Sequence, residues 1–352
     1  MKEENSRKLK LKQERFLPGP RIINCYRIEG TLTTKTPLHV GSGEVQKTQG
    51  KEGEELPLLL VMKDHQGRPM IPGSSLRGAL RGWLEANLAP FNSPGSYDVA
   101  SFSCGEFDFQ KGLTPARLEE VRKGILGEVN KDSSLKTEAE RHEAIETRMT
   151  AYYLEHLDLV AGLFGHGRFH SRVDFENAVL EVGQNDDPLV RMPGVSIDPV
   201  TGAARKGHLF AVEAVKPGRQ FQVSLQFRNV HEWEIGMVLA ALEALSDPDF
   251  PLRLGGHEGT DYGRVEWNIS SVRSFGSQEG PLDGKAMLAA WMRWCVPSQA
   301  SPAGATGSTD AKAFRDRCLK DLSTRLKELV SSGPAAEGAG PEGKSGGEAG
   351  HA

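Results

Sequence analysis

Two segments with the alternating pattern of a strand are each followed by a helical segment, and this order constrains the fold more than any other feature of the chain. Residues 26–34 and 221–229 alternate apolar and polar side chains as half-buried strands do. Apolar residues recur at helical spacing over 76–84, and an Ala- and Leu-rich helix is expected over 235–245. Two strand–helix units with an antiparallel sheet predict an α+β fold with a ferredoxin-like core, the topology of the RNA-recognition motif.

The composition is that of a globular protein with room for one large domain or two small ones. The chain has 352 residues, of which 38% are hydrophobic and 26% charged. No apolar run approaches the roughly 20 residues that a membrane helix needs, so we expect no membrane partner. The net charge of -4 restricts any nucleic-acid site to a local basic patch. The cysteines show no paired spacing, which favours a reducing, cytoplasmic location over a disulfide scaffold. They are Cys25, Cys104, Cys295 and Cys318.

Changes in composition divide the chain into four parts. Residues 1–21 are a basic N-terminal arm, and residues 22–295 are expected to form the main domain. Residues 296–331 contain a linker and an amphipathic helix, and the Gly-rich residues 332–352 are expected to be disordered. An insertion of charged helical sequence interrupts the main domain at about 90–155.

Three further segments of the main domain are predicted from turn-forming residues. A β-hairpin is expected at about 190–210, because its tip at 198–202 reads Asp-Pro-Val-Thr-Gly. The polar residues 44–55 have no apolar period and are expected to form a mobile surface loop. Residues 163–168 read Leu-Phe-Gly-His-Gly-Arg and predict a glycine turn.

A glycine-rich loop at 253–265 is the first candidate site. Glycine lets the backbone come close to a ligand, and successive exposed amides form a concave anion site. The loop lacks the Gly-Lys-Ser/Thr of a nucleotide phosphate loop, and a strand-like run follows it, so a polynucleotide backbone is the favoured ligand. A plain tight turn is the alternative. The candidate RNA-binding residues in this loop are Arg253, Gly255, Gly256, His257, Tyr262, Gly263 and Arg264.

The start of the helix expected after residue 73 is the second candidate site. Ser74 or Ser75 stands at the N-cap position, where free amides and the helix dipole favour an anion. Arg77 and Arg81 are four residues apart and share one helix face. The alternative is a capped helix with a solvated basic face. Together with the glycine-rich loop, the pattern favours phosphate binding.

Other candidates lie in the hairpin and after the first strand. Arg191, Arg205 and Lys206 give the hairpin a basic surface, although an ordinary hairpin is the alternative. His39 is a candidate RNA contact or general base, whereas a histidine in such a loop more often closes it by a hydrogen bond. The adjoining Gly41, Ser42 and Gly43 are candidate RNA contacts. His166 and His170 lack further ligands at suitable spacing, so no metal site is predicted.

Taken in chain order, these motifs resemble the RAMP superfamily of CRISPR systems, most closely the backbone subunit of type III effector complexes. The resemblance spans roughly residues 22–270. It is carried by Leu38–Gly43, Ile71–Arg81, Leu163–Gly165, Ser171–Val173, Gly194–Asp198, Gly202–Phe210, Glu213, Leu254–Gly256 and Tyr262–Val265. It implies a ferredoxin-like palm and a thumb hairpin at 190–210. The implied partners are a CRISPR guide RNA, a target RNA paired with it in antiviral defence, and other RAMP subunits.

The resemblance also bears on catalysis. Several members of the superfamily cut target RNA with an aspartate in the loop after the Leu-His-Val-Gly motif and a divalent metal ion. This chain has no aspartate between Gly43 and Leu56, and Glu55 stands nearest to the expected position. The catalytic candidates are therefore Glu55 and His39. We expect no tightly bound cofactor, with Mg²⁺ or another divalent ion needed only if the protein cleaves RNA.

Three functions remain open from the sequence. The first is a guide-RNA-binding subunit without nuclease activity. The second is an active, metal-dependent endoribonuclease in the same complex that uses Glu55 or another carboxylate, such as Asp64 or Asp108. The third is an unrelated nucleotide-binding enzyme.

Overall fold

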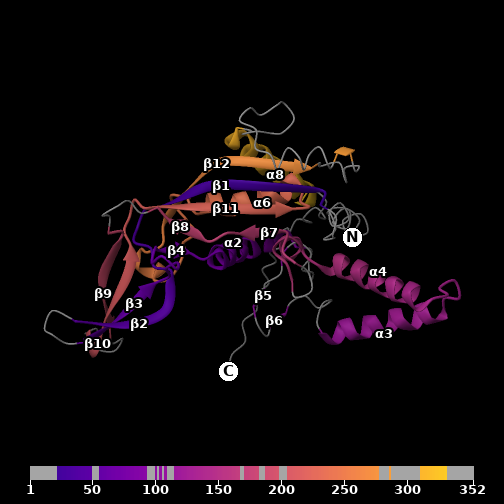
Figure 1. Ribbon diagram of the computed structural model, residues 1–352, viewed down its shortest axis with the longest axis horizontal. Coiled ribbons are helices and arrows are strands. Elements are labelled where there is room, and N and C mark those ends of the chain that lie inside the picture. The colour runs from indigo at the N-terminus through magenta and orange to yellow at the C-terminus, as the bar shows by residue number, and fades with distance from the viewer. Residues whose placement is uncertain are drawn as a thin grey trace, which may run out of the picture.

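The computed structural model shows a mixed α+β protein, as the sequence predicts (Figure 1). It describes residues 22–49, 55–92, 100, 103–104, 107–108, 115–166, 170–181, 187–197, 204–276, 285–286 and 310–330. The strands are β1 (Asn24–Thr34), β2 (Gly41–Gln49), β3 (Glu55–Val61), β4 (Met70–Ile71), β5 (Ser103–Cys104), β6 (Phe107–Asp108), β7 (Val173–Phe175), β8 (Ala178–Leu180), β9 (Leu189–Ile197), β10 (Ala204–Val215), β11 (Gln220–Arg228) and β12 (Val265–Gly276). The helices are α2 (Gly73–Leu88), α3 (Pro115–Lys131), α4 (Glu138–His156), α5 (Leu159–Phe164), α6 (Glu232–Ala244) and α8 (Ala311–Val330), with short 3-10 helices η1 (Ala89–Phe91) and η2 (Glu258–Thr260).

The main sheet is antiparallel and has the strand order β12-β1-β11-β8-β4, with β7 also paired to β11. Side chains on β1 alternate between buried and half-buried along its whole length, as the sequence pattern predicts. The buried side chains, such as Ile28 and Leu32, meet apolar residues of α2, α6 and α8 in one core. Helices α6 and α8 run along the sheet in Figure 1. The two predicted strand–helix units therefore build the main layer of the molecule.

A second, four-stranded sheet has the order β2-β3-β10-β9 and extends away from the main sheet (Figure 1). The hairpin expected at 190–210 is confirmed as β9 and β10, while its tip at 198–203 lies outside the described residues. The surface loop expected at 44–55 is wrong for the described part, because residues 44–49 belong to β2 and Glu55 begins β3. Cross-strand pairing stabilises β2, although its own sequence has no apolar period.

The insertion contains two helices, α3 and α4, as its charged helical sequence predicts. Helix α4 begins with a capping box, in which the side chain of Thr137 accepts the N–H of Glu140 and the Glu140 carboxylate accepts the N–H of Thr137. Helices α3 and α4 share a small core of their own, separate from the main one. Its buried members are Leu118, Met149, Tyr153, Leu157 and Ala161. Figure 1 shows the pair projecting from the main sheet.

Two helices near the core, α5 and α8, can be compared with the sequence predictions. The glycine turn expected at 163–168 is wrong at its start, because residues 159–164 form helix α5, capped by the Asp158 carboxylate 2.7 Å from the N–H of Ala161. The C-terminal amphipathic helix is confirmed as α8, whose Phe314 and Cys318 are buried in the main core. Among the described residues, no helix is long and apolar enough to cross a membrane.

Candidate nucleic-acid interface

The glycine-rich loop is fastened to the segment that follows β1. The N–H of Gly263 donates to the carbonyl of Pro37 at 2.9 Å, and the N–H of Gly256 donates to the carbonyl of His39 at 2.9 Å. Gly255 and Gly263 have φ of 84° and 82°, a conformation that favours glycine. A Cβ on Gly255 would overlap the His39 carbonyl. These glycines therefore allow the backbones of two predicted RNA-binding segments to lie in close contact. The fold brings the two segments together.

His39, His257, Tyr262 and Phe210 form an aromatic cluster at this junction. The ring centroid of His257 lies 5.4 Å from that of His39, 5.6 Å from that of Tyr262 and 6.4 Å from that of Phe210. Phe210 belongs to β10, so the cluster joins the glycine-rich loop to the second sheet. Partial burial raises the pKa of Tyr262 above its usual value. The cluster offers ring faces and edges beside the exposed loop.

His39 is buried, at 6% exposure, and its Nδ1 lies 2.7 Å from the backbone carbonyl of Glu213. This bond fits the loop-closing role that the sequence leaves open for the residue. The Glu213 side chain is also engaged, because its carboxylate accepts the N–H of Val61 and pairs with Lys63 at 3.0 Å. His39 is thus held in place from β10 on one side and from the glycine-rich loop on the other.

The two arginines of the glycine-rich loop differ in their availability. Arg253 Nη1 donates to Asp261 Oδ1 at 3.0 Å and to the carbonyl of Tyr262 at 3.1 Å, so it braces the loop from within. The backbone of Arg264 pairs with Thr36 and Lys35, whereas its guanidinium makes, among the described residues, only a long contact of 3.5 Å to the carbonyl of Pro248. Of the two guanidinium groups, that of Arg264 is therefore the more available to a ligand.

Arg77 and Arg81 point the same way, as their shared helix face predicts. Both contact backbone carbonyls of the protein itself. Arg77 donates to the carbonyl of Phe164, and Arg81 Nη1 donates to the carbonyl of Gly165 at 3.1 Å. These carbonyls end helix α5, where cations are favoured by the helix dipole. Arg81 also pairs with Glu85 at 2.7 Å. Burial, and then the nearby Arg81 charge, lower the pKa of Arg77.

The start of α2 is capped differently from the prediction. Helix α2 begins at Gly73 with Pro72 at the N-cap and no side-chain cap, so the expected cap by Ser74 or Ser75 is wrong. Asn177 fills the role from another segment, because its Oδ1 accepts the N–H of Gly73 at 2.9 Å. Both serines lie exposed in the first turn, where their side chains remain accessible to a ligand.

The remaining candidates lie along the second sheet. Arg191 is exposed on β9, and Gly41, Ser42 and Gly43 begin β2, with Gly43 at a φ of 81°. Arg205 and Lys206 belong to β10, but their side chains lie outside the described residues.

The two catalytic candidates are far apart. The β2–β3 register pairs Gly41 with Val61 at one end and Gln49 with Glu55 at the other. Val61 lies six residue steps along β3 from Glu55, which is about 20 Å. Glu55 is exposed and pairs with Lys47 at 2.6 Å, while His39 is buried at the opposite end. Among the described residues, no group of three His, Cys, Asp or Glu side chains could hold a metal ion.

The outer face of the main sheet is polar and offers no stacking surface along its two central strands. Arg27 donates to Glu29 at 2.9 Å and to Glu176 at 2.9 Å across this face. The outward positions of β1 and β11 carry Cys25, Arg27, Glu29, Thr31, Thr33, Gln220, Gln222, Ser224, Gln226 and Arg228. RNA-recognition motifs stack bases on aromatic residues of this face. RNA held in that way is not expected here.

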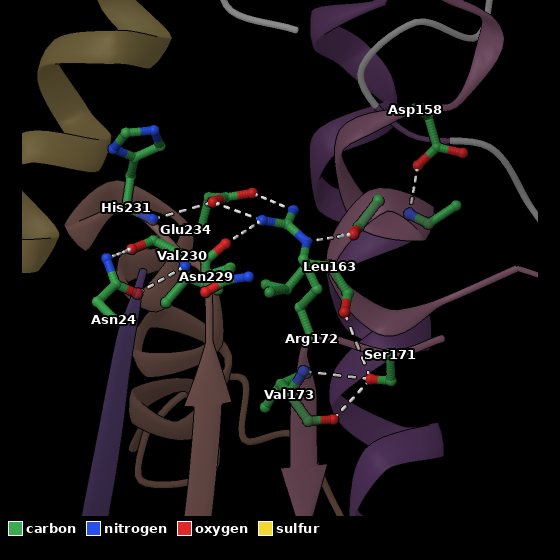
Figure 2. Close-up of polar contacts among 12 residues, drawn as sticks. Asn24, Asp158, Leu163, Ser171, Arg172, Val173, Asn229, Val230, His231 and Glu234 are labelled. Carbon is green, nitrogen blue, oxygen red and sulfur yellow. Dashed lines mark hydrogen bonds and ion pairs between the residues drawn. The ribbon is translucent and has the colours of Figure 1, made fainter. Parts of the chain in front are cut away.

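Sequence reasoning missed a buried ion pair between Arg172 and Glu234 (Figure 2). Arg172 Nη1 donates to Glu234 Oε2 at 3.0 Å and to the carbonyl of Asn229 at 2.8 Å, and its Nε donates to the carbonyl of Gly162 at 2.9 Å. Glu234 also accepts the N–H of His231 at 3.0 Å. The signal was a charged residue at an inward position of each segment, and a buried charge needs a partner.

Comparison with known proteins agrees with this architecture. Residues 31–266 match the family model described as the RAMP superfamily. The chain is also similar to the protein named "CRISPR system Cms endoribonuclease Csm3" of Methanocaldococcus jannaschii. The two are 23% identical over 242 residues, which cover 68% of this chain and 77% of the relative.

Proposed function

Because the chain belongs to the RAMP superfamily, we propose that it is a guide-RNA-binding subunit of a type III CRISPR effector ribonucleoprotein. The similarity to a protein named as a CRISPR endoribonuclease supports this assignment. The observation that carries it is the junction of the glycine-rich loop with the segment after β1, where Gly256 and Gly263 bind the backbone of that segment. These bonds use the amides of Gly256 and Gly263, and the junction holds the Arg264 side chain beside the exposed loop residues 258–261, where its guanidinium is suited to a phosphate backbone.

The proposed palm is ferredoxin-like, and the strand order supports it. When β1, β7 with β8, β11 and β12 are counted as strands one to four, the sheet order becomes four, one, three, two. Helix α2 follows the first of these strands and α6 follows the third. The hairpin of β9 and β10 is the proposed thumb, and its exposed apolar pair Val195 and Leu209 lies directly cross-strand.

Binding through phosphates has consequences for specificity. Phosphate contacts carry no base identity, so affinity depends on salt and hardly on sequence. Pairing between the guide and the target RNA then selects the target, as in other RNA-guided effectors. The proposed partners are accordingly the guide RNA, its target and further subunits of the complex.

Arg264 tests the assignment of the loop. The variant Arg264→Ala is expected to weaken binding of a guide-length RNA and to reduce the slope of log affinity against log salt by about 1. Arg228→Ala is the control. Arg228 is an exposed arginine that pairs with Cys25 at the start of β1, whereas Arg264 directly precedes Val265, which pairs with Thr34 at the end of β1. Fluorescence anisotropy at several salt concentrations measures both variants. If Arg264→Ala binds with the affinity and slope of the unaltered protein, the loop does not hold the RNA backbone.

The name of the relative favours a second candidate function, cleavage of the target RNA. Glu55 is the first carboxylate to test, since it is exposed and pairs with Lys47 on the neighbouring strand at 2.6 Å. The assembled complex is incubated with labelled complementary RNA and Mg²⁺. Products that appear at regular spacing and vanish in Glu55→Ala would assign cleavage to this subunit. Glu44→Ala, an exposed glutamate on β2, is the matched control.

A further inference from the structure

The loop that follows α6 displays an aromatic side chain to solvent. Phe250 is 87% exposed, the largest value among the exposed large apolar side chains of the described residues. Keeping a phenyl ring in water is unfavourable, because its burial releases free energy. Single exposed apolar residues are nevertheless common on protein surfaces, so the surroundings of this ring decide what it can bind.

Hydrogen bonds hold the loop in one conformation. The N–H of Leu252 donates to the carbonyl of Ala244 at 2.8 Å and closes the loop at its base. At the tip, Asp247 Oδ1 accepts the N–H of Asp249 at 2.9 Å and that of Phe250 at 2.7 Å. The ring therefore stands on a preformed loop, and a ligand that binds it has little backbone to order.

The same loop lies against the segment that carries Arg264. Ser246 Oγ accepts the N–H of Trp267 on β12 at 2.8 Å. The guanidinium of Arg264, which directly precedes β12, makes its 3.5 Å contact with the carbonyl of Pro248. Phe250 is two residues from Pro248, so the Cα atoms of these two residues are at most about 7 Å apart. The exposed ring and the available guanidinium are therefore neighbours on one surface.

The charges around the ring have a direction. Arg264 supplies a cation on the side of Pro248. Asp247 and Asp249 are both exposed, and neither forms an ion pair with a cation in the part of the chain that the structure describes. The guanidinium attracts a phosphate and the carboxylates repel it, whereas the face of an uncharged base can stack on the ring. A nucleotide matches this arrangement when its phosphate lies on Arg264 and its base on Phe250.

We propose that Phe250 is a stacking platform for an unpaired base of the RNA strand whose phosphate binds Arg264. The inference rests on the proposed RNA-binding function and adds a base contact to it. Stacking on an aromatic ring tolerates every base, because each base has a π face. The contact therefore strengthens binding of single-stranded RNA without adding a strong sequence preference.

RNA fits this side chain better than a protein partner does. The central strands β1 and β11, which the structure describes in full, carry no aromatic side chain on their outer face. A base therefore cannot stack there as it does in an RNA-recognition motif. The loop after α6 supplies a ring that the sheet lacks, next to the loop proposed to hold the RNA backbone. A protein partner that covers the ring gives no role to the available guanidinium beside it.

Fluorescence anisotropy of the full chain with single-stranded RNA of guide length measures the contact at several salt concentrations. Phe250→Ala is expected to weaken binding at least about fivefold. Its slope of log affinity against log salt should stay unchanged, because stacking releases no counterions, whereas Arg264→Ala lowers the slope. Phe250→Tyr retains the ring and should bind like the unaltered protein. Leu126→Ala, at an exposed apolar residue of α3, is the control that should also bind normally.

Photocrosslinking locates the base. RNA that contains iodouridine is irradiated with the protein, and the crosslinked peptide is identified by mass spectrometry. A crosslink at Phe250 is expected with single-stranded RNA and not with a fully paired duplex of the same length. In the assembled complex, iodouridine is placed in the guide in one sample and in the target in another, and the crosslinked sample shows which strand supplies the base.

The outcomes separate this proposal from the function on which it rests. If Arg264→Ala binds RNA more weakly but Phe250→Ala binds like the unaltered protein, Arg264 holds the backbone and the stacking proposal is wrong. The exposed ring is then left as a contact for a protein. An unaltered protein that binds no RNA overturns both proposals. Stacking is also overturned if Phe250→Tyr binds as weakly as Phe250→Ala, because the tyrosine variant retains the ring.

Discussion

At the scale of single residues, the geometry of the candidate site depends on backbone atoms that only glycine permits. Gly255 combines a φ of 84° with close approach to the carbonyl of His39. The adjoining amide of Gly256 uses that same carbonyl as its acceptor. One missing Cβ therefore sets the position of His39 relative to the loop that carries Arg264.

Gly255→Ala is expected to destabilise the protein by at least about 1–3 kcal/mol, because alanine is strained at this φ and its Cβ meets the His39 carbonyl. The same variant should weaken RNA binding, since the loop must move away from His39. Gly259→Ala is the control. No atom lies within 4 Å of a Cβ at Gly259, so that change should be neutral or slightly stabilising. Urea unfolding and RNA anisotropy measure both effects, and equal behaviour of the two variants would contradict this account.

At the scale of elements, Arg172 holds three segments together (Figure 2). It binds the carbonyl of Gly162 in α5, the carbonyl of Asn229 after β11, and the carboxylate of Glu234 in α6. Arg172 itself lies just before β7, whose strand pairs with β11. The buried guanidinium thus fixes the angle at which α5 and α6 leave the sheet.

Arg172→Met is expected to cost about 3–5 kcal/mol, because it leaves the fully buried Glu234 carboxylate without its cation. Arg228→Met removes an exposed pair with Asp174, whose side chains are 61% and 46% exposed, and should cost under about 1 kcal/mol. Urea unfolding compares the two. The double variant Arg172→Met/Glu234→Leu should be more stable than Arg172→Met alone. A small loss in Arg172→Met would show that the ion pair is not essential to the packing.

At the scale of the whole molecule, the core closes through a helix near the C-terminal end of the described chain. Phe314 of α8 is 2% exposed, and its ring lies 5.7 Å from that of Tyr26 on β1. Arg317 and Arg315 extend the contact to Glu232 and Glu243 at the two ends of α6. Helix α8 therefore belongs to the same packed core as the main sheet, although a long segment outside the described residues precedes it.

Phe314→Ala is expected to cost about 3–5 kcal/mol, as for other large-to-small changes in a core. Leu126→Ala, at a residue that is 44% exposed on α3, should change stability by less than about 0.5 kcal/mol. Thermal unfolding of the full chain gives both values. If the Phe314→Ala protein is as stable as the Leu126→Ala protein, packing of α8 does not contribute to the stability of the domain.

The elements that could be predicted from the sequence are those that a local pattern of residues indicates. Strands β1 and β11 and helix α2 follow their own apolar periodicity, and helix α6 follows from its Ala- and Leu-rich composition. The misses depend on distant residues. Asn177 caps α2 from 104 residues away, and the acceptor of Arg77 lies 87 residues further along the chain. The partner of Arg172 is 62 residues away, so the local pattern can indicate two inward charges but not that they pair with each other. Residue types at the site were thus predictable, while their partners were not.

The position of β1 between β11 and β12 determines when this strand can pair during synthesis of the chain. Its neighbours β11 and β12 both follow much later, since Cys25 pairs with Arg228 and with Phe275. At a synthesis rate of about 5–20 residues per second, β1 leaves the ribosome roughly 10–40 seconds before its first partner does. Throughout that interval its apolar side chains and unpaired edges face the ribosome surface, chaperones and other nascent chains. Among the strands of the main sheet, β1 therefore waits longest for its first partner.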